Sequence, residues 1–274
     1  MKIVKYLTVI VVAALLSSCL GDEDNKIEVK TPTFSYVRDY NGSLVAAVSG
    51  INMYIVSNTL SNTASHGDCV FLTYTTQHGA SSSGIYGAEI KTISDPIEQE
   101  PIEKVTQIPT LENQVYPSTM SVKTYSPDSF LGDRWLFNGS FELKDEEIVV
   151  PRFYYNTENQ IEIDSNKNPV TIGKNCGIID VRFVVINPNE EEDAVKMPVT
   201  RDDIVGDFSN ARVSGFLPVE GLSASSTTVN FPFKFRYIRS TIDGKGNTVL
   251  ETMYLGAWST NTSNSYGLTL TYDK

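Results

Sequence analysis

Histidine and cysteine are the side chains best suited to bind a transition metal or to form a nucleophile–base pair, and this sequence holds few of them. Its only histidines are His66 and His78. His66 lies three residues before Cys69 in the run HGDC, so both side chains could bind one metal ion. A structural zinc site needs four protein ligands, however, and Cys69 opens an apolar strand-like run that would turn its thiol into the core. We therefore predict neither a metal centre nor a Cys–His nucleophilic pair here.

The segment DSNKNP begins like a calcium-binding loop, with Asp164, Asn166 and Asn168 at alternate positions. Such a loop needs a glycine next and a bidentate glutamate at its twelfth position. This sequence has Pro169 and Asn175 at those places. The segment therefore predicts an ordinary turn in which an Asx side chain accepts hydrogen bonds from the backbone.

A second acidic segment, NPNEEED at residues 187–193, carries four consecutive carboxylates: Glu190, Glu191, Glu192 and Asp193. These groups could hold a cation, but a run of like charges is usually a solvated loop. We predict no metal site and no cofactor.

Motifs of familiar catalytic machinery are absent from the sequence, which has no HExxH, CxxC, GxSxG or phosphate-binding glycine loop. Paired carboxylates could hydrolyse glycosidic bonds, but such pairs are defined by a spatial separation of roughly 5–9.5 Å, which a sequence does not give. No catalytic residue is assigned, and we predict a protein that is not an enzyme.

Three cysteines occur, and two of them, Cys69 and Cys176, lie far from the N-terminus. Each sits in or beside an apolar run, so we expect buried free thiols. Their spacing does not require a disulfide, which stays an open alternative.

The composition is that of an acidic globular protein. The 274 residues are 41% apolar and carry a formal charge of −11. That apolar content is enough for a core. The negative charge repels phosphate backbones, so nucleic acid is not an expected partner.

The N-terminus has the features of a secretory signal. Lys2 and Lys5 precede an apolar run from Tyr6 to Leu16, which is too short to cross ~30 Å of hydrocarbon at ~1.5 Å per residue. The run ends in LSSC, which resembles a bacterial lipobox. We predict that residues 1–18 are a lipoprotein signal peptide and that Cys19 is lipidated and holds the protein on a membrane. An ordinary signal peptide that happens to contain a cysteine is the alternative.

Three acidic residues, Asp22, Glu23 and Asp24, follow that cysteine closely. They favour a solvated tether over residues 19–32. They also resemble the surface-export signal of Bacteroidetes-type lipoproteins, and both interpretations can hold together. The predicted location is the outer membrane, lipid-anchored, at the cell surface.

Period-two alternation dominates the rest of the chain. In FPFKFRYI, residues 231–238, four aromatic residues alternate with Pro232, Lys234, Arg236 and Ile238. The turn DGKGN and a second apolar run follow, which predicts a hairpin. Residues 178–186 and 267–272 alternate in the same way.

The first part of the chain is also predicted to be β. Asn41-Gly42 is a turn dipeptide between two strands, and residues 69–76 and 85–93 are expected to pair. Residues 199–208 are expected to form one short helical turn. The chain is therefore predicted to be all-β.

Four prolines fall within residues 94–117, which we interpret as a linker or as edge strands with loops. The predicted domains are a small OB-like β-barrel at residues 33–112 and an antiparallel β-sandwich at residues 113–274.

The order of these features is similar to that of the NigD-like lipoproteins of Bacteroidetes. The similarity rests on the lipobox and acidic tether, on HGDCVFLTYTT and YGAEIKTISDPI in the first domain, and on GDRWLFNGSFEL and CGIIDVRFVVINPNEEED in the second. It implies an OB-like barrel before a β-sandwich and no established catalytic residues.

Together these observations predict a lipid-anchored surface protein with a non-enzymatic binding or assembly role, for which a glycan or a protein is a possible partner. The alternative is a glycan-binding or glycan-hydrolysing surface lipoprotein, since Tyr and Trp rings could stack on sugars. Most aromatic residues are nevertheless expected to pack in the core. A third possibility is a subunit that accepts a donor strand.

Overall fold

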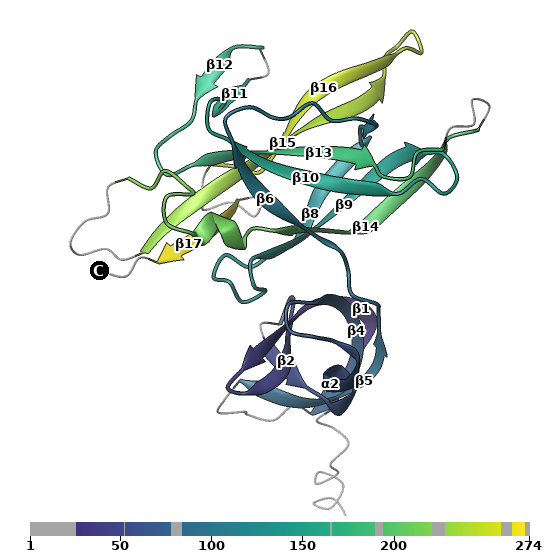
Figure 1. Ribbon diagram of the computed structural model, residues 1–274, viewed down its shortest axis with the longest axis vertical. Helices are drawn as coiled ribbons and strands as arrows, with labels where there is room; N and C mark the ends of the chain where they lie inside the picture. Colours follow the sequence, from purple (N-terminus) through teal and green to yellow (C-terminus); the bar gives the residue numbers. More distant parts are fainter. Residues whose placement is uncertain are drawn as a thin grey trace, which may run out of the picture.

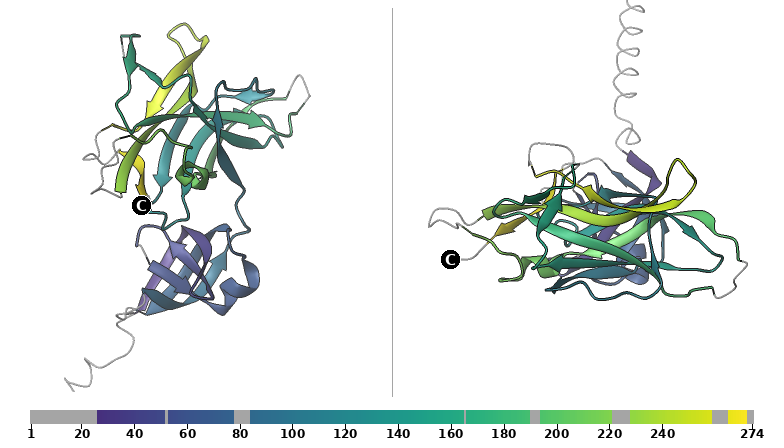
Figure 2. Two further views of the ribbon diagram at one scale, coloured as in Figure 1. Left: turned by 60° about the vertical axis from the view of Figure 1, so that its left-hand side comes forward. Right: turned by 90° about the horizontal axis from the view of Figure 1, so that it is seen from above.

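The structure is a computed structural model that describes residues 26–271, apart from 52, 78–83, 165, 190–193, 221–227 and 259–264 (Figure 1). Strands make up most of it, with one short α-helix and one 3₁₀ turn. The predicted all-β class is therefore confirmed. Two modules lie one above the other along the longest axis, as both Figure 1 and the left view of Figure 2 show.

The first module is a closed five-stranded barrel in the order β1-β2-β3-β5-β4. Its elements are β1 (Lys26–Tyr40), β2 (Ser43–Val48), β3 (Met53–Val56), α2 (Asn58–Thr63), β4 (Cys69–Gln77) and β5 (Ile85–Ile93). The Asn41-Gly42 turn joins β1 to β2, with φ of 52° and 79°, which is the left-handed geometry that this dipeptide favours. The predicted pairing of β4 with β5 is confirmed.

The second module is a larger mixed sheet in the order β16-β15-β13-β10-β6-β14-β9-β8. These strands are β6 (Gln99–Val105), β8 (Thr119–Thr124), β9 (Arg134–Leu143), β10 (Val149–Asn156), β13 (Gly177–Val185), β14 (Met197–Asp207), β15 (Thr228–Ile242) and β16 (Thr248–Leu255). β7 (Gln114–Val115) pairs with β13, β17 (Tyr266–Thr271) pairs with β15, and β11 (Ile161–Ile163) pairs with β12 (Pro169–Thr171). The short 3₁₀ turn η1 is Ser209–Arg212.

Strand β6 lets this sheet fold over on itself. Its first half pairs with β14 and its second half with β10, and both pairings are parallel. β13 and β15 are parallel as well. The predicted sandwich is therefore present, but it is mixed rather than purely antiparallel.

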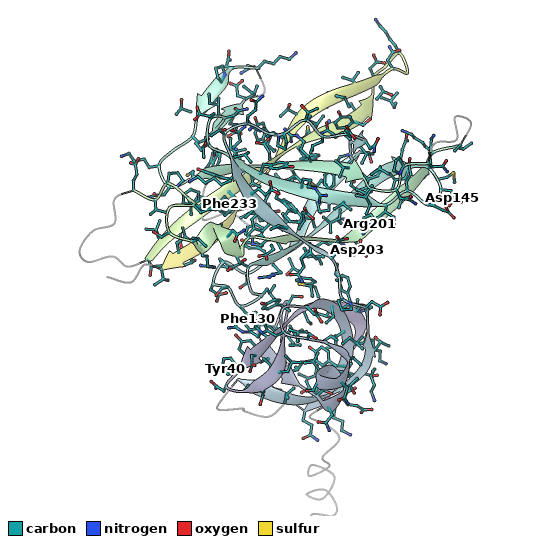
Figure 3. The ribbon with its side chains drawn as sticks, viewed as in Figure 1. Tyr40, Phe130, Asp145, Arg201, Asp203 and Phe233 are labelled. Atoms are coloured by element: carbon teal, nitrogen blue, oxygen red, sulfur yellow. The ribbon has the colours of Figure 1, made fainter. Side chains whose placement is uncertain are left out.

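Aromatic rings fill the space between the layers of the larger sheet. Trp135, Phe137 and Phe208 contact Phe235 with ring centroids 5.1–5.9 Å apart. The alternation in residues 231–238 is confirmed, since its aromatic side chains are all buried; Figure 3 labels Phe233 among them. The predicted β15–β16 hairpin is also confirmed.

Two predicted boundaries differ from the structure. Strand β1 begins at Lys26, inside the predicted tether of residues 19–32. β6 belongs to the larger sheet, so the modules divide between Ile93 and Gln99 rather than after residue 112. The prolines of this segment argued against a strand in the sequence. Pro101 is tolerated in β6 because it lies where the strand changes partner from β14 to β10.

The helical turn predicted at residues 199–208 is wrong. Residues 199–207 lie in β14, which pairs with β9 from Met197 to Asp207 around a register shift between Arg201 and Ile204, and Phe208 follows the strand. Long-range pairing overrides the local preference of an acidic segment.

Apolar contacts and one arginine join the two modules. Phe34, Cys69 and Val205 are buried in a shared cluster with Leu131 and Leu136.

Arg134 of the larger sheet lies over the ring of Tyr36 of the barrel, 4.9 Å from the ring centroid, and forms an ion pair with Asp207 at 2.9 Å. Gln99 donates a hydrogen bond to the carbonyl of Gly67 at 2.8 Å. The two modules thus share a packed junction.

Candidate functional site

Several residues singled out from the sequence lie outside the described part of the chain. They are Cys19, Asp22, Glu23, Asp24, His78 and Glu190 to Asp193. Within the described ranges, no helix has both the length and the apolar content needed to cross a bilayer.

The HGDC segment has a structural role. The ring nitrogen Nδ1 of His66 accepts a hydrogen bond from the backbone N–H of Asp39 at 2.9 Å, and Asp68 accepts one from Ser65 at 2.8 Å. Cys69 is buried in the junction cluster, and burial raises the pKa of its thiol to about 12. No group of three His, Cys, Asp or Glu side chains able to hold a metal occurs among the described residues.

Asp164 forms the predicted Asx turn. Its Oδ1 accepts hydrogen bonds from the backbone N–H groups of Asn166 and Asn168, both at 2.8 Å. The turn lies between β11 and β12, where it supports that hairpin.

Cys69 and Cys176 are both free thiols, as expected. Cys176 is only half-buried, in contrast to the prediction, because it lies in the segment before β13 and lines a surface hollow. Its pKa is raised by burial.

That surface hollow, which we call the edge hollow, has a volume of about 780 Å³. It lies between the segment after β12 and the segment after η1. Tyr155, Leu217 and Val219 supply apolar lining, while Thr157 and Ser214 supply hydroxyl groups. A hollow of this size with mixed lining is of the kind that binds small molecules.

Hydrogen bonds hold the rim of the edge hollow in place. The side chain of Asn175 donates to the carbonyl of Glu220 at 3.0 Å and accepts from its N–H at 2.7 Å. Lys104 donates to the carbonyl of Gly215 at 2.6 Å. Tyr155 also lines the edge hollow, and burial raises the pKa of its hydroxyl to about 12.

A second hollow of about 400 Å³ lies at the junction, where β6 separates β10 from β14. Arg201 binds Asp203 through two hydrogen bonds of 2.7 and 3.0 Å, and it donates to the carbonyl of Val149 at 3.2 Å. Figure 3 shows Arg201 and Asp203 on the side of the larger sheet that faces the barrel.

The edge of β10 at this gap offers little to an added strand. Pro151 has no N–H, its carbonyl accepts a hydrogen bond from Arg152 at 3.1 Å, and Arg152 also forms an ion pair with Glu100. Burial raises the pKa of Glu100, and Arg152 opposes that shift. A donor strand would have to break these contacts.

One buried cluster of charged side chains was not predicted from the sequence. In the alternation of residues 178–186, Asp180 falls on the polar face of its strand, yet the structure buries it completely. Arg236 binds its two oxygens at 2.7 Å each, and Arg182 binds Oδ1 at 3.1 Å. The sequence shows Asp180 and Arg182 on the polar face of one predicted strand and Arg236 on the polar face of another. Only the structure shows that these strands, β13 and β15, are neighbours.

The two tryptophans occupy different environments. Trp135 is fully buried. The indole N–H of Trp258 donates to Glu162 at 2.7 Å, and the ammonium of Lys234 lies 4.8 Å from the centroid of the Trp258 ring. The expectation that aromatic residues mostly form the core holds for Trp135 and the phenylalanines around it.

Comparison with known proteins supports the fold and does not identify a family. No protein-family model and no curated protein matches the chain. A solved structure of an uncharacterized protein from Parabacteroides merdae aligns with a TM-score of 0.54 at 12% identity, over 89% of this chain and 100% of that one. A Bacteroides fragilis protein provisionally assigned as a lipoprotein aligns with a TM-score of 0.50 at 8% identity, over 84% and 96%. The similarity extends over both modules of this chain.

Proposed function

We propose that this protein is a lipid-anchored protein of the outer membrane, exposed at the cell surface, with a non-enzymatic role in binding or assembly. The observation that carries the proposal is the position of β1. That strand begins at Lys26, only seven residues after Cys19. It begins at the end of the barrel remote from the larger sheet (Figure 2, left).

The register of β1 places this start. Lys26 pairs with Gln77, whereas Tyr36, ten residues further along β1, pairs with Cys69 in the junction cluster. Seven residues span at most about 25 Å when fully extended. An acylated Cys19 would therefore hold the barrel next to the membrane and the larger sheet away from it, with the edge hollow accessible to a ligand.

Kinship with the NigD-like lipoproteins is part of the proposal. It is supported by the barrel-then-sandwich order and by the sequence segments quoted above. The Bacteroides fragilis neighbour supports a lipoprotein in coarser terms.

Replacement of Cys19 tests the anchor. The Cys19→Ala variant should leave the membrane fraction and appear in the aqueous phase, because the sulfur that carries the acyl chains is gone. Membrane pelleting followed by immunoblotting measures this. Cys176→Ala is the matched control and should stay with the membrane. A Cys19→Ala variant that still pellets with membranes contradicts lipid anchoring.

The acidic residues test the surface location. Replacing Asp22, Glu23 and Asp24 together with Ala should reduce cleavage by a protease added to intact cells, if these residues direct export to the surface. Neutralising Glu28 and Glu89, which lie on the barrel strands, provides a control with altered charge outside the tether. Equal cleavage of the triple variant and the parent protein would refute the export signal.

A further inference from the structure

Two hairpins project from the larger sheet at the end remote from the barrel, and a groove lies between them. They are β11–β12 and the outer part of β15–β16 (Figures 1 and 2). The groove has a volume of about 400 Å³. In the proposed anchored protein it would lie on the side that faces away from the membrane.

The β11–β12 wall of the groove is held rigidly. Arg236 donates to the carbonyls of Asn159 and Ile161 at 3.0 and 3.1 Å, and the N–H of Ile163 donates to the hydroxyl of Tyr254 at 3.0 Å. These bonds leave Ile161 and Ile163 exposed at 41% and 42% on the groove side. Exposed apolar side chains on a rigid support are typical of protein contact sites.

The opposite wall continues along β15–β16 as a strip of isoleucine and leucine side chains with short hydroxyl side chains between them. In the antiparallel register Ser240 faces Leu250 and Ile242 faces Thr248, so these side chains share one face of the hairpin with Ile238. Leu250 is 49% exposed and Ile242 is 64% exposed. The strip runs beyond the recess itself, which favours an extended chain over a compact small molecule.

The floor of the groove carries positive charge. Arg236 and Arg182 share the single carboxylate of Asp180, which leaves a net charge of +1 in a chain whose formal charge is −11. Arg236 has acceptors for all five of its N–H groups. Arg182 donates through Nη1 to the carbonyls of Val181 and Arg236, and through Nη2 to Asp180. Its Nε–H and its second Nη2–H have no acceptor among the described residues.

We propose that this groove docks an extended segment of a partner protein that carries apolar side chains around an acidic one. The apolar side chains pack on Ile161, Ile163 and Ile238, and the carboxylate accepts hydrogen bonds from Arg182. This inference rests on the proposed binding role but not on the lipid anchor. A Cys19→Ala variant that stays with membranes would contradict only the anchor, and a groove that binds no peptide would contradict only this inference.

Three fluorescein-labelled synthetic peptides test the proposal: Gly-Leu-Asp-Leu-Val-Gly and the same peptide with Asn or Lys in place of Asp. Fluorescence anisotropy with the full-length protein in detergent, with detergent alone as the blank, measures binding. The Asp peptide should bind about tenfold more tightly than the Asn peptide, and the Lys peptide should bind least. Added salt should weaken binding of the Asp peptide.

Variants locate the binding. Arg182→Gln should weaken binding of the Asp peptide about tenfold and leave binding of the Asn peptide unchanged. Ile163→Asp should weaken binding of both peptides. Arg201→Gln, at the junction, is the control and should change neither. Because Arg182→Gln also removes a partner of the buried Asp180, Thr252→Glu provides a second test. Thr252 is exposed in the groove, and a carboxylate there competes for Arg182.

Three results would overturn the proposal. The first is equal binding of the Asp and Asn peptides, or no binding of any peptide. The second is unchanged binding by both Arg182→Gln and Thr252→Glu. The third is a concentration-dependent dimer in sedimentation that Ile163→Asp abolishes, since that result would identify a second copy of the chain as the occupant.

Discussion

Asp180 connects two strands of the larger sheet through charge rather than through apolar packing. Its carboxylate is fully buried, and two arginines from β13 and β15 surround it. Removing the carboxylate leaves the charge of the buried Arg236 uncompensated, which costs far more than the loss of an exposed ion pair.

The Asp180→Asn variant should therefore lose about 3–5 kcal/mol of unfolding free energy, because Arg236 keeps its charge in a buried site and half-buried Arg182 loses its carboxylate partner. Urea denaturation followed by circular dichroism measures the loss. The matched control is Asp203→Asn, whose ion pair with Arg201 is partly exposed and should contribute about 0–1 kcal/mol. Similar losses in the two variants would show that burial of Asp180 is unimportant.

The free thiols give a prediction about pH. Burial raises the pKa of Cys69 to about 12 and also raises that of Cys176, so each holds less reactive thiolate at a given pH than an exposed cysteine. In the folded protein, alkylation of Cys176 by iodoacetamide should accelerate about tenfold per pH unit between pH 7 and 9, and Cys69 should react only after unfolding.

Peptide mass spectrometry measures the labelling of each cysteine. The same protein in urea is the control, and both thiols should then react at similar rates. Rapid labelling of Cys69 at neutral pH in the folded protein would contradict its place in the junction core.

At the scale of elements, β15 organises the larger sheet. It pairs with β17 along its first half, with β16 along its second half, and with β13 on its other side. Its aromatic face enters the core, whereas its polar face carries Lys234 and Arg236, which fix the β11–β12 hairpin through Glu162 and backbone carbonyls. One strand therefore supports both the core and the groove.

Phe235→Ala should cost about 3–5 kcal/mol of unfolding free energy, since the ring is fully buried among other aromatic rings and its removal leaves a cavity. Chemical denaturation measures this. Lys245→Ala, in the exposed turn after β15, should change the stability little. A Phe235→Ala variant of near parental stability would mean that the faces of β15 are reversed.

On the scale of the whole molecule, the junction decides whether the two modules move together. Gly132 lies there with φ of +61°, and a Cβ at this position would stand 2.2 Å from the Tyr36 ring. That ring is the one on which Arg134 lies. A Cβ at this position would collide with the ring, and the positive φ adds backbone strain, so the contact requires glycine.

Gly132→Ala should loosen the junction while leaving each module folded. Limited proteolysis should then cut the segment between β5 and β6, residues 94–98, faster than in the parent protein. Gly246→Ala is the matched control, because its φ of +85° imposes similar backbone strain but nothing lies within 4 Å of the new Cβ. Equal cleavage in the two variants would show that the Tyr36 contact does not hold the modules together.

Local patterns were sufficient for the class of the fold and for several neighbouring strands. Alternation in residues 231–238 gave the buried face of β15, and Asn41-Gly42 and DGKGN gave two hairpins, because each signal depends on residues close together in the chain. The N-terminal prediction of a lipidated cysteine likewise rests on adjacent residues alone.

Tertiary structure decided what depends on distant segments. The parallel partners of β6, the burial of Asp180 and the groove between two hairpins all require strands that are far apart in sequence to lie side by side. Alternation along a strand shows which face a side chain occupies. Whether that face is buried depends on elements from elsewhere in the chain that pack against it. The physical reason is that burial and charge pairing are properties of the packed neighbourhood, whereas periodicity is a property of the strand.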